Sequence, residues 1–382
     1  MRKKKKNYRK MSNMRIFVGL LMALLFSMCT SPKQKGEGLP VLNVADALDA
    51  ALPDTFTWNS IAKNVRMIPL KTKHVMGGSL NVKYFSDDLI IVYDLSTRSV
   101  FVFDGEGREK VVFSHYGQGP KEYLYVTAIN YQEKDSLIML YDNGKKKLFR
   151  FDLQGRFVDA RPADTGGIIL RIDSEGNMSS INKKGKALVS LWDNNLQLKG
   201  EYLPFDTLYD DQQKISTQIL SGKTNNCDAF KLLPVYSDTV YSITKEGVEP
   251  FCVLDRGGYK CSADDLKDMQ KVMFDSDYLC GEQLYSVSSY FCYFTQAIGV
   301  MELWDMRSGE LVAWNKRDFE GPEHDLVWGF RYVFPSGYEI RPFTFDYISK
   351  DRGIFIRQAD ECLDDVEGLT ADDNPVLVVL EF

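Results

Sequence analysis

The chain has 382 residues, with 47 Lys and Arg against 53 Asp and Glu, and its formal net charge is −6 at pH 7. The first 28 residues hold eight of the basic residues and no acidic residue, so the rest of the chain carries a net charge of −14. A body this acidic repels phosphate backbones, and no basic stripe stands out, so we expect no nucleic-acid partner.

The N-terminal segment has the pattern of a secretion signal. Basic residues between Arg2 and Arg15 precede an apolar run of 11 residues, Ile16–Phe26. A membrane-spanning helix needs about 20 apolar residues, so the run fits the apolar core of a signal peptide better than a permanent span. We therefore predict a signal peptide over residues 1–28.

Cys29 follows this apolar run and precedes a short polar stretch. The arrangement resembles the lipobox of bacterial lipoproteins, although Met28 occupies a position where a small residue is usual. The resemblance implies that the Cys29 thiol is acylated and becomes the mature N-terminus, with residues 29–40 as a flexible tether. It implies a lipid anchor in the outer membrane of the cell envelope, on either its periplasmic or its surface face. An ordinary cleaved signal peptide with an incidental cysteine is the alternative.

The seven cysteines give no metal or redox motif, because none of them forms a C-x-x-C pair. In an oxidising compartment one or two disulfides could form in the second half of the chain, and buried free thiols are the alternative. The candidates for pairing are Cys252, Cys261, Cys280 and Cys292.

An internal repeat points to the fold. Residues 89–108 align without a gap with residues 137–156, and nine of the 20 positions are identical. An offset of 48 residues is typical of β-propeller blades, which have about four strands each. In each copy, two runs rich in β-branched and aromatic residues are separated by a polar turn, and an aromatic-Asp pair with a glycine turn ends the second run. Each copy therefore predicts a β-hairpin.

Weaker copies of the repeat continue along the chain. Trp192-Asp193 and Trp304-Asp305 occupy the position of the aromatic-Asp pair, and we interpret both tryptophans as strand-end residues that fill the core between blades. The predicted blades lie near residues 79–117, 124–165, 166–206, 213–257 and 283–318, with a sixth that begins near residue 326.

The sixth blade lacks one strand, so the chain's other end must complete it. Residues 343–348, 353–357 and 375–382 give three strands, and Val65–Leu70 is the predicted donor of the fourth. The predicted fold is thus all-β: a six-bladed β-propeller over residues 41–382 with four-stranded antiparallel blades, whose ring is closed by N- and C-terminal strands. Closure of this kind removes free sheet edges. Ser262, with Asp265 three residues later, predicts one short inserted helix over residues 262–269.

The sequence is similar to the six-bladed propeller lipoproteins of Bacteroidota, a family distantly similar to NHL-type propellers. The resemblance rests on Gly117–Tyr123 (GQGPKEY), on the Phe-Asp-x-x-Gly-Arg hairpins, on Ile68–Leu70 and on Asp373–Leu377. It covers roughly residues 40–382 and implies fold and location. It brings no catalytic residues with it.

Enzyme motifs are weak in this sequence. The three histidines, His74, His115 and His324, are far apart, and no metalloprotease spacing occurs. The acidic pairs fall at predicted turns, where solvated Asp is usual. Our leading hypothesis is a non-catalytic binding or scaffolding module that engages a glycan, a peptide or a partner protein of the envelope. The sequence does not indicate which cofactor, if any, the protein uses. The alternative is a metal-dependent hydrolase or lyase with its site at the mouth of the propeller channel.

The predicted ligand site lies in the loop after the first blade. Gln118 offers a donor and an acceptor, Glu122 an anionic acceptor, and Tyr123 a flat ring with a hydroxyl, which together suit sugars or peptide termini. Loops from several blades meet at the channel mouth, so we expect the site there. The alternative is that the same residues only hold the turn between blades.

Overall fold

The computed structural model describes residues 38–50, 55–182, 185–205, 229–234, 237–262, 265, 278–279, 282–295, 299–316, 329–349 and 351–382. The chain divides into two units, Met1–Leu39 and Pro40–Phe382, and all the described strands belong to the second unit. The predicted signal peptide and Cys29 lie outside the described residues, as do most of the helix predicted over residues 262–269 and part of the fourth predicted blade.

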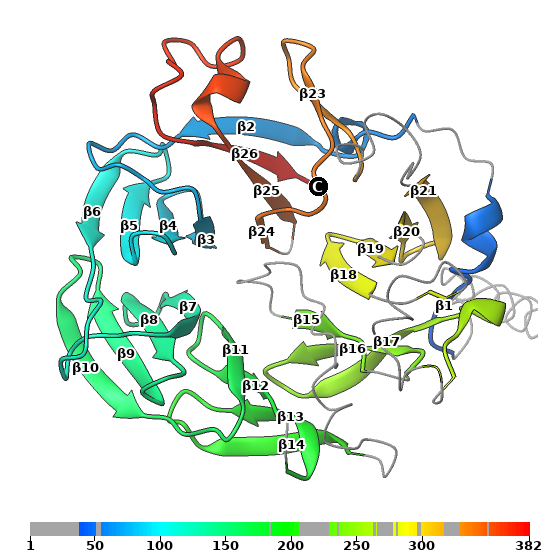
Figure 1. Ribbon diagram of the computed structural model, residues 1–382, viewed down its shortest axis with the longest axis horizontal. Helices are drawn as coiled ribbons and strands as arrows, with labels where there is room; N and C mark the ends of the chain where they lie inside the picture. The colour runs from blue at the N-terminus through cyan, green and yellow to red at the C-terminus, as the bar shows by residue number, and fades with distance from the viewer. Residues whose placement is uncertain are drawn as a thin grey trace, which may run out of the picture. The chain divides into compact units, whose positions relative to one another are not determined.

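Six four-stranded sheets form a six-bladed β-propeller, and their innermost strands face a common centre (Figure 1). Blades 1 to 3 each consist of four consecutive antiparallel strands. From the centre outward they are β3 (Leu80–Phe85), β4 (Leu89–Asp94), β5 (Ser99–Asp104) and β6 (Glu109–Phe113); β7 (Val126–Gln132), β8 (Leu137–Asp142), β9 (Lys147–Asp152) and β10 (Phe157–Pro162); and β11 (Ile168–Ile172), β12 (Met178–Ile181), β13 (Ala187–Trp192) and β14 (Leu198–Pro204).

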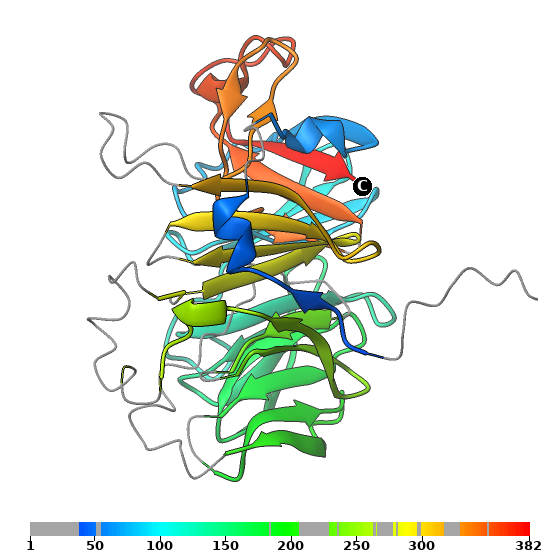
Figure 2. The same ribbon diagram turned by 90° about the vertical axis from the view of Figure 1, so that its right-hand side faces the viewer.

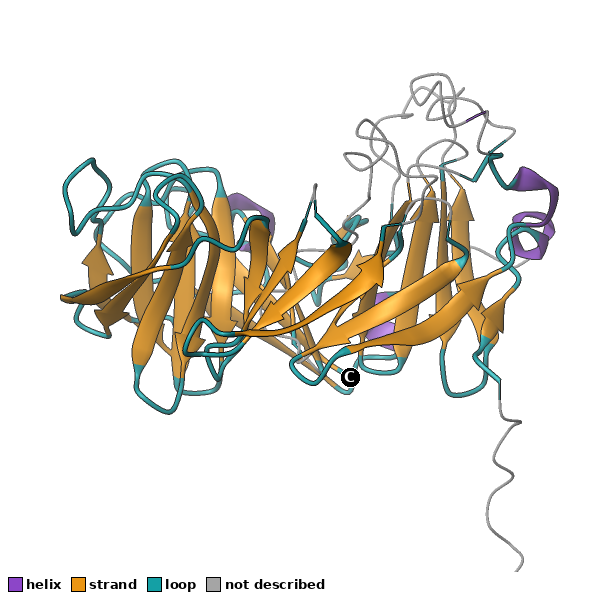
Figure 3. Cartoon of the chain, turned by 90° about the horizontal axis from the view of Figure 1, so that it is seen from below, coloured by secondary structure: helices purple, strands orange, loops and turns teal. Residues whose placement is uncertain are grey.

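Blades 4 to 6 complete the ring, and two of them take their outermost strand from the start of the described chain. Figure 3 shows that this unit consists mostly of strands, in orange, joined by loops. The strands are β15 (Ala229–Leu232), β16 (Thr239–Thr244), β17 (Val248–Leu254) and β1 (Val41–Leu42); β18 (Glu282–Val287), β19 (Tyr290–Thr295), β20 (Val300–Asp305) and β21 (Glu310–Lys316); and β24 (Tyr347–Ile348), β25 (Arg352–Arg357), β26 (Val376–Glu381) and β2 (Asn64–Pro69). The predicted fold class is confirmed.

The ring closes as predicted, because β2 pairs with β26 along its whole length in antiparallel register. A cluster of charges ties this closing pair to blade 1. Asp87 lies 2.8 Å from Arg66 and 3.3 Å from Arg352, and Glu381 contacts both arginines from the other side. The two guanidinium groups also lie over the ring of Phe85. Single exposed ion pairs contribute little, so the paired and buried strands provide most of the closure energy.

Blade 4 differs from the prediction, which made it from consecutive strands. Its outermost strand is β1, which pairs with β17 in parallel, with Val41 opposite Val253. Figure 2 shows β1 and the following 3-10 turn η1 (Asp46–Asp49), both in blue, along the outer side of the blades. A two-residue strand with no copy of the repeat gives no signal in the sequence, which is why the pairing was missed.

Blade 6 carries two additions that were not predicted. The hairpin β22 (Tyr332–Val333) and β23 (Glu339–Ile340) precedes its first strand, and residues 358–375 with the 3-10 turn η6 (Ala359–Cys362) connect β25 to β26. Ser336 joins the two additions through hydrogen bonds to Asp365. None of the described helices, including η2 (Trp58–Ser60) and η4 (Gly257–Tyr259), is long and apolar enough to cross a membrane.

The repeated hairpins form for local chemical reasons. The Asp104 carboxylate accepts the backbone N–H groups of Glu106 and Arg108, and Asp152 does the same in the next blade. Gly107 and Gly155 complete the turns at φ of 78° and 72°, which other residues rarely adopt. The predicted aspartate-glycine turn is thus confirmed.

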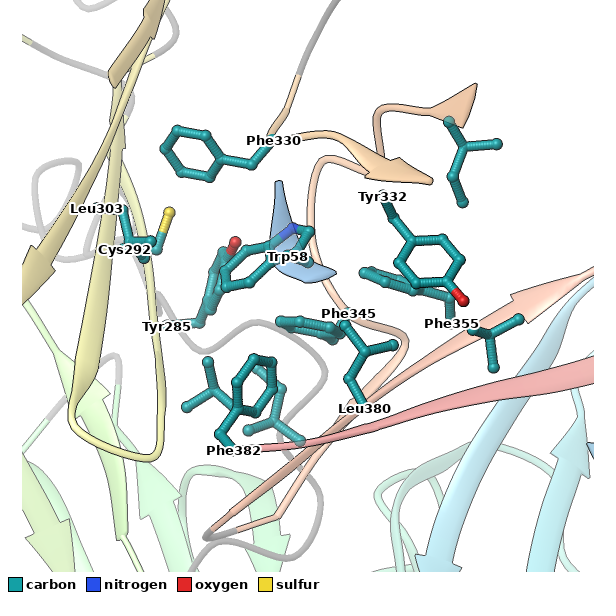
Figure 4. Close-up of a cluster of buried hydrophobic side chains, with 14 of the residues drawn as sticks. Trp58, Tyr285, Cys292, Leu303, Phe330, Tyr332, Phe345, Phe355, Leu380 and Phe382 are labelled. Carbon is teal, nitrogen blue, oxygen red and sulfur yellow. The ribbon is translucent and has the colours of Figure 1, made fainter. Parts of the chain in front are cut away.

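Hydrophobic side chains fill the joints between blades. Phe103 and Phe151, at equivalent repeat positions, have no exposed surface, as predicted; Phe103 lies in the joint of blades 6 and 1, and Phe151 in that of blades 1 and 2. Trp58 lies within a cluster of aromatic rings at blade 6 (Figure 4). The ring centroids of Phe345 and Phe382 lie 4.8 and 5.9 Å from that of Trp58.

Candidate functional site

The predicted ligand residues lie in the loop of residues 114–125, which connects β6 to β7. Its two arms are tied together, because the N–H of Tyr123 donates to His115 O at 2.8 Å and the N–H of Gly117 donates to Tyr123 O at 3.0 Å. The segment between the arms is therefore a closed loop at the joint of blades 1 and 2.

A lysine ammonium group holds this loop from inside. Lys145, in the turn between β8 and β9, donates from Nζ to the carbonyl oxygens of Gly117, Gly119 and Glu122 at 3.1, 2.9 and 2.6 Å. Three carbonyl oxygens around one ammonium group use all three of its donors. Lys145 therefore acts as an internal cation that fixes the shape of the loop.

The structure places the three predicted residues differently from one another. Tyr123 is fully buried; its hydroxyl donates to Arg98 O at 2.8 Å, and burial raises its pKa to about 12. The half-buried Glu122 accepts the N–H of Gly119 at 2.7 Å. Gln118 is exposed. Glu122 therefore makes a contact within the loop, Tyr123 joins the loop to the β4–β5 turn, and ligand binding by the three residues stays a prediction.

Two exposed tyrosines bracket this loop, and the sequence reasoning missed them. Tyr116 and Tyr125 are 54% and 61% exposed. The guanidinium of Arg98 lies 5.8 Å from the ring centroid of Tyr116, while Tyr125 accepts the N–H of Asn143 at its carbonyl. The Tyr116 ring thus lies near the β4–β5 turn of blade 1, and the backbone of Tyr125 is bonded to the β8–β9 turn of blade 2. We call Tyr116, Gln118 and Tyr125 the tyrosine face.

A small hollow lies where the inner strands of the same two blades meet. Its volume is about 150 Å³, below the usual range of roughly 300–1,000 Å³ for a whole ligand, so it suits a single substituent. Its lining includes Thr127, whose buried hydroxyl has no hydrogen-bond partner in the part of the chain that the structure describes. The lining residues are Asn81, Lys83, Tyr93, Leu95 and Val126–Ile129.

A larger cavity of about 910 Å³ lies at the joint of blades 6 and 1. One wall comes from the chain that leads out of β2 and from the start of β6, and the other from the insertion between β25 and β26. We call this cavity the rim cleft. Its lining residues are Pro69–Lys73, Arg108, Glu109, Val366–Leu369, Asp373 and Asn374.

Hydrogen bonds organise the floor of the rim cleft. The Glu109 carboxylate accepts the Thr72 hydroxyl and lies 3.0 Å from His74 Nδ1. Burial raises the pKa of Glu109, but these hydrogen bonds outweigh it and hold the pKa below its usual value. Asn374 joins the two walls by donating to Thr72 O at 3.0 Å. These hydrogen bonds fix the residues of the floor and connect the two walls of the cleft.

The described residues do not form the metal site that the enzyme alternative requires. Within the described ranges, no three His, Cys, Asp or Glu residues gather in a way that could hold a metal ion. His115 stacks on Phe151 at 4.8 Å and bonds Gly155 O, and His324 lies outside the described residues. Cys252 and Cys292 are buried free thiols, and burial raises the pKa of Cys252 to about 12.

One buried carboxyl group lies outside both the tyrosine face and the rim cleft. Glu302 on β20 has no exposed surface; one carboxyl oxygen accepts Trp304 Nε1 at 2.9 Å, and the other has no hydrogen-bond partner among the described residues. Burial raises the pKa of Glu302 to about 8, against a smaller lowering by the Trp304 hydrogen bond. Glu302 is therefore neutral at pH 7, within the joint of blades 4 and 5 where Trp304 packs.

Sequence comparison places the chain in a family of propellers without an assigned role. The family described as Domain of unknown function (DUF4934) matches residues 39–381, nearly the whole of the described unit. The chain belongs to this family. Among curated proteins, none matches the DUF4934 chain.

The solved structures that this DUF4934 protein matches have low sequence identity to it. A Bacteroides fragilis protein named as a candidate exported protein has 13% identity and a TM-score of 0.56, and the match covers 86% of this chain and 97% of that one. A DUF4221 member from Bacteroides vulgatus has 9% identity, a TM-score of 0.42 and coverage of 84% and 97%. Virginiamycin B lyase from Staphylococcus aureus has 8% identity and a TM-score of 0.42, and the match covers 84% of this chain and 99% of that one. The match to the Bacteroides fragilis protein supports the propeller fold.

Proposed function

We propose that this DUF4934 protein is a non-catalytic binding module of the cell envelope, and that it binds carbohydrate on the tyrosine face. The observation that carries the proposal is the exposure of Tyr116 and Tyr125, at 54% and 61% of their surface. Peptides and partner proteins are the other ligands that the sequence predicts.

Exposed aromatic rings on a rigid scaffold suit sugar binding. A tyrosine offers an apolar ring face with a polar hydroxyl at its tip, and it has few rotatable bonds to immobilise on binding. The loop that carries Tyr116 is fixed by Lys145, so the ring is held on an ordered segment. Gln118 adds an amide that can donate to and accept from hydroxyl groups. The nearby 150 Å³ hollow suits one substituent of such a ligand.

A glycan-binding assay with matched variants tests this proposal. The double variant Tyr116→Ala/Tyr125→Ala should weaken binding of glycan ligands found on an array by about tenfold or more, because a hot-spot aromatic contributes about 2 kcal/mol or more. The control is Tyr338→Ala, which removes a 48% exposed tyrosine from the β22–β23 hairpin. Both proteins should melt within a few degrees of the unchanged chain. Equal glycan binding by the double variant and the unchanged chain would contradict the proposal.

The location is part of the same proposal. The basic head, the 11-residue apolar run and Cys29 support export and a lipid anchor in the outer membrane, and the Bacteroides fragilis relative is named as a candidate exported protein. Anchoring should depend on the thiol, so Cys29→Ser should move the protein from the membrane fraction to the soluble envelope fraction. A Cys29→Ser protein that still partitions into detergent would contradict lipidation at this residue.

A further inference from the structure

The rim cleft is separate from the tyrosine face in both position and chemistry. It lies between blades 6 and 1, whereas Tyr116 and Tyr125 bracket the joint of blades 1 and 2. One of its walls, Val366–Leu369, belongs to the long connection between β25 and β26. The corresponding connections in blades 1 and 2 are turns of four residues, 95–98 and 143–146. Blade 6 therefore carries extra chain that is not needed for strand pairing and that builds half of a cavity.

Some charged groups of the rim cleft have hydrogen-bond or ion-pair partners within the protein, and others have none among the described residues. The Glu109 carboxylate is occupied by Thr72 and His74, and Asp373 accepts both the N–H and the hydroxyl of Thr370. Arg108 is paired with Asp104 and Glu106, on the side of its own turn.

The side chains of Lys71 and Lys73 are exposed, and no ion pair or hydrogen bond engages their ammonium groups within the described part of the chain. Glu367 on the opposite wall is exposed and likewise without an ion pair to a described residue. Two positive groups and one negative group thus remain for a ligand. The whole lining holds three basic and three acidic side chains, so the two lysine ammonium groups without described partners, and not a net positive charge, favour a ligand with carboxylates.

The uncharged lining decides which kind of anionic ligand fits. Pro69, Leu70, Val366 and Leu369 give the cleft aliphatic surface, and no aromatic residue is among its lining residues. A sugar ring would find no aromatic face on which to stack, in contrast to the tyrosine face. Aliphatic patches beside two ammonium groups match the alternating apolar and acidic side chains of an extended peptide.

We propose that the rim cleft binds an extended acidic peptide segment of a partner protein, with its carboxylates at Lys71 and Lys73 and its aliphatic side chains against Leu70 and Leu369. A volume of about 910 Å³ accommodates several residues of such a segment. The backbone of Lys71 is already paired with Gly107 and Glu109, so the peptide is held by side chains at this point.

A direct binding experiment uses the full chain in mild detergent and a fluorescein-labelled Glu-Leu-Glu-Leu-Glu-Leu peptide, read by fluorescence anisotropy. Lys71→Glu/Lys73→Glu should weaken binding by about tenfold or more, and Glu367→Lys should strengthen it. The matched control is Lys63→Glu/Lys134→Glu, which makes the same change in net charge at exposed lysines outside the cleft. Higher salt should weaken binding by the unchanged chain.

Three results would overturn the proposal. The first is no saturable binding of the peptide at millimolar concentration. The second is an equal loss in the Lys63→Glu/Lys134→Glu control, which would mean that only overall charge matters. The third is an oligogalacturonate that displaces the peptide and binds more tightly through the same two lysines, which would assign the cleft to acidic sugars.

The outcome is independent of the proposed carbohydrate site. Tyr116→Ala/Tyr125→Ala should leave peptide binding unchanged, and Lys71→Glu/Lys73→Glu should leave glycan binding unchanged. Both lysine side chains are exposed, so the variant should fold, and a melting curve that matches the control variant verifies this. Peptide binding that is lost in the tyrosine variant would place the peptide at the tyrosine face and contradict the assignment of the cleft.

Discussion

Two joints between blades can be compared, that of blades 1 and 2 and that of blades 6 and 1. They have the same packing at their glycine turns and differ in their connecting segments. In both, an outermost strand runs against the glycine turn of the next blade. A Cβ atom on Gly155 would collide with the Phe113 ring, and one on Gly107 would collide with the carbonyl of Pro69. These close approaches explain why the Gly-Arg turn is repeated, because any larger residue would push the blades apart.

Beyond the turn, the connecting segments make the two joints different. At the joint of blades 1 and 2, the loop of residues 114–125 folds over Lys145 and uses all three of its donors. At the joint of blades 6 and 1, the chain after β2 leaves the ammonium groups of Lys71 and Lys73 free of described partners, beside a cavity of about 910 Å³. The repeat therefore determines how blades pack, and the connections between blades determine where a ligand has room.

The largest expected effect comes from removing the closing strand. Deletion of residues 375–382 should leave no folded monomer, because β2 would lose its partner strand, β25 would become a free edge, and the buried side chains of Val376–Leu380 would be lost. Each of these five buried side chains contributes about 1.5–3 kcal/mol, so their sum of about 7.5–15 kcal/mol is comparable to the usual 5–15 kcal/mol stability of a folded domain. Size-exclusion chromatography and melting measure the loss. A truncated monomer with the melting curve of the full chain would contradict the closure.

The repeat predicts that the hydrophobic cores of the two joints contribute equally to the free energy of unfolding. Phe103→Ala and Phe151→Ala should each cost about 3–5 kcal/mol in the free energy of unfolding, because both rings are fully buried at equivalent positions. Denaturant titration of the two variants side by side gives both values. A loss below roughly 1 kcal/mol in either variant would show that its joint is not packed as described.

The third joint, between blades 4 and 5, offers a pH-dependent comparison. Glu302 holds its proton in the folded protein up to about pH 8 and releases it near its ordinary pKa of 4.5 when unfolded. The folded state thus binds more protons between these two values, so this group makes stability fall by about 1.4 kcal/mol per pH unit as the pH rises from 4.5 to 8.

Replacement of this acid by an amide isolates its contribution. Glu302→Gln lacks the titrating proton, so its stability relative to the unchanged chain should rise steadily from pH 5 to pH 8. Subtracting the unchanged chain at each pH cancels the other titrating groups. If the stability difference between Glu302→Gln and the unchanged chain were the same at pH 5 and pH 8, the Glu302 carboxyl would not be protonated in the folded protein as described.

The parts of the fold that were predictable are those with local chemistry that repeats. The Asp-Gly turns form from residues four positions apart, so Asp104 and Asp152 marked their hairpins in the sequence. The need for a fourth strand in blade 6 pointed to Val65–Leu70. β1 was missed because two residues carry no periodicity, and the β22–β23 hairpin because it lies outside the repeat.

The candidate site was less predictable than the fold. Tyr123 and Tyr125 are two positions apart in one run, yet the first is fully buried and the second is 61% exposed. That difference depends on the hydrogen bonds of the closed loop and on Lys145, which is 22 residues further along the chain. Likewise, the rim cleft combines segments that are about 300 residues apart, and no pattern in the sequence brings them together.

The most direct test of the contrast between the two joints compares one lysine from each. Lys145→Met removes the ammonium donor from three carbonyl oxygens, of which Gly119 O keeps the N–H of Glu122, and should cost about 1–3 kcal/mol, which lowers the melting temperature by a few degrees. Lys71→Met removes a charge that has no described partner and should leave the melting temperature unchanged within about one degree. Thermal melting of the two variants beside the unchanged chain decides the matter: the account predicts a loss for Lys145→Met alone, and equal melting temperatures for the two variants would contradict it.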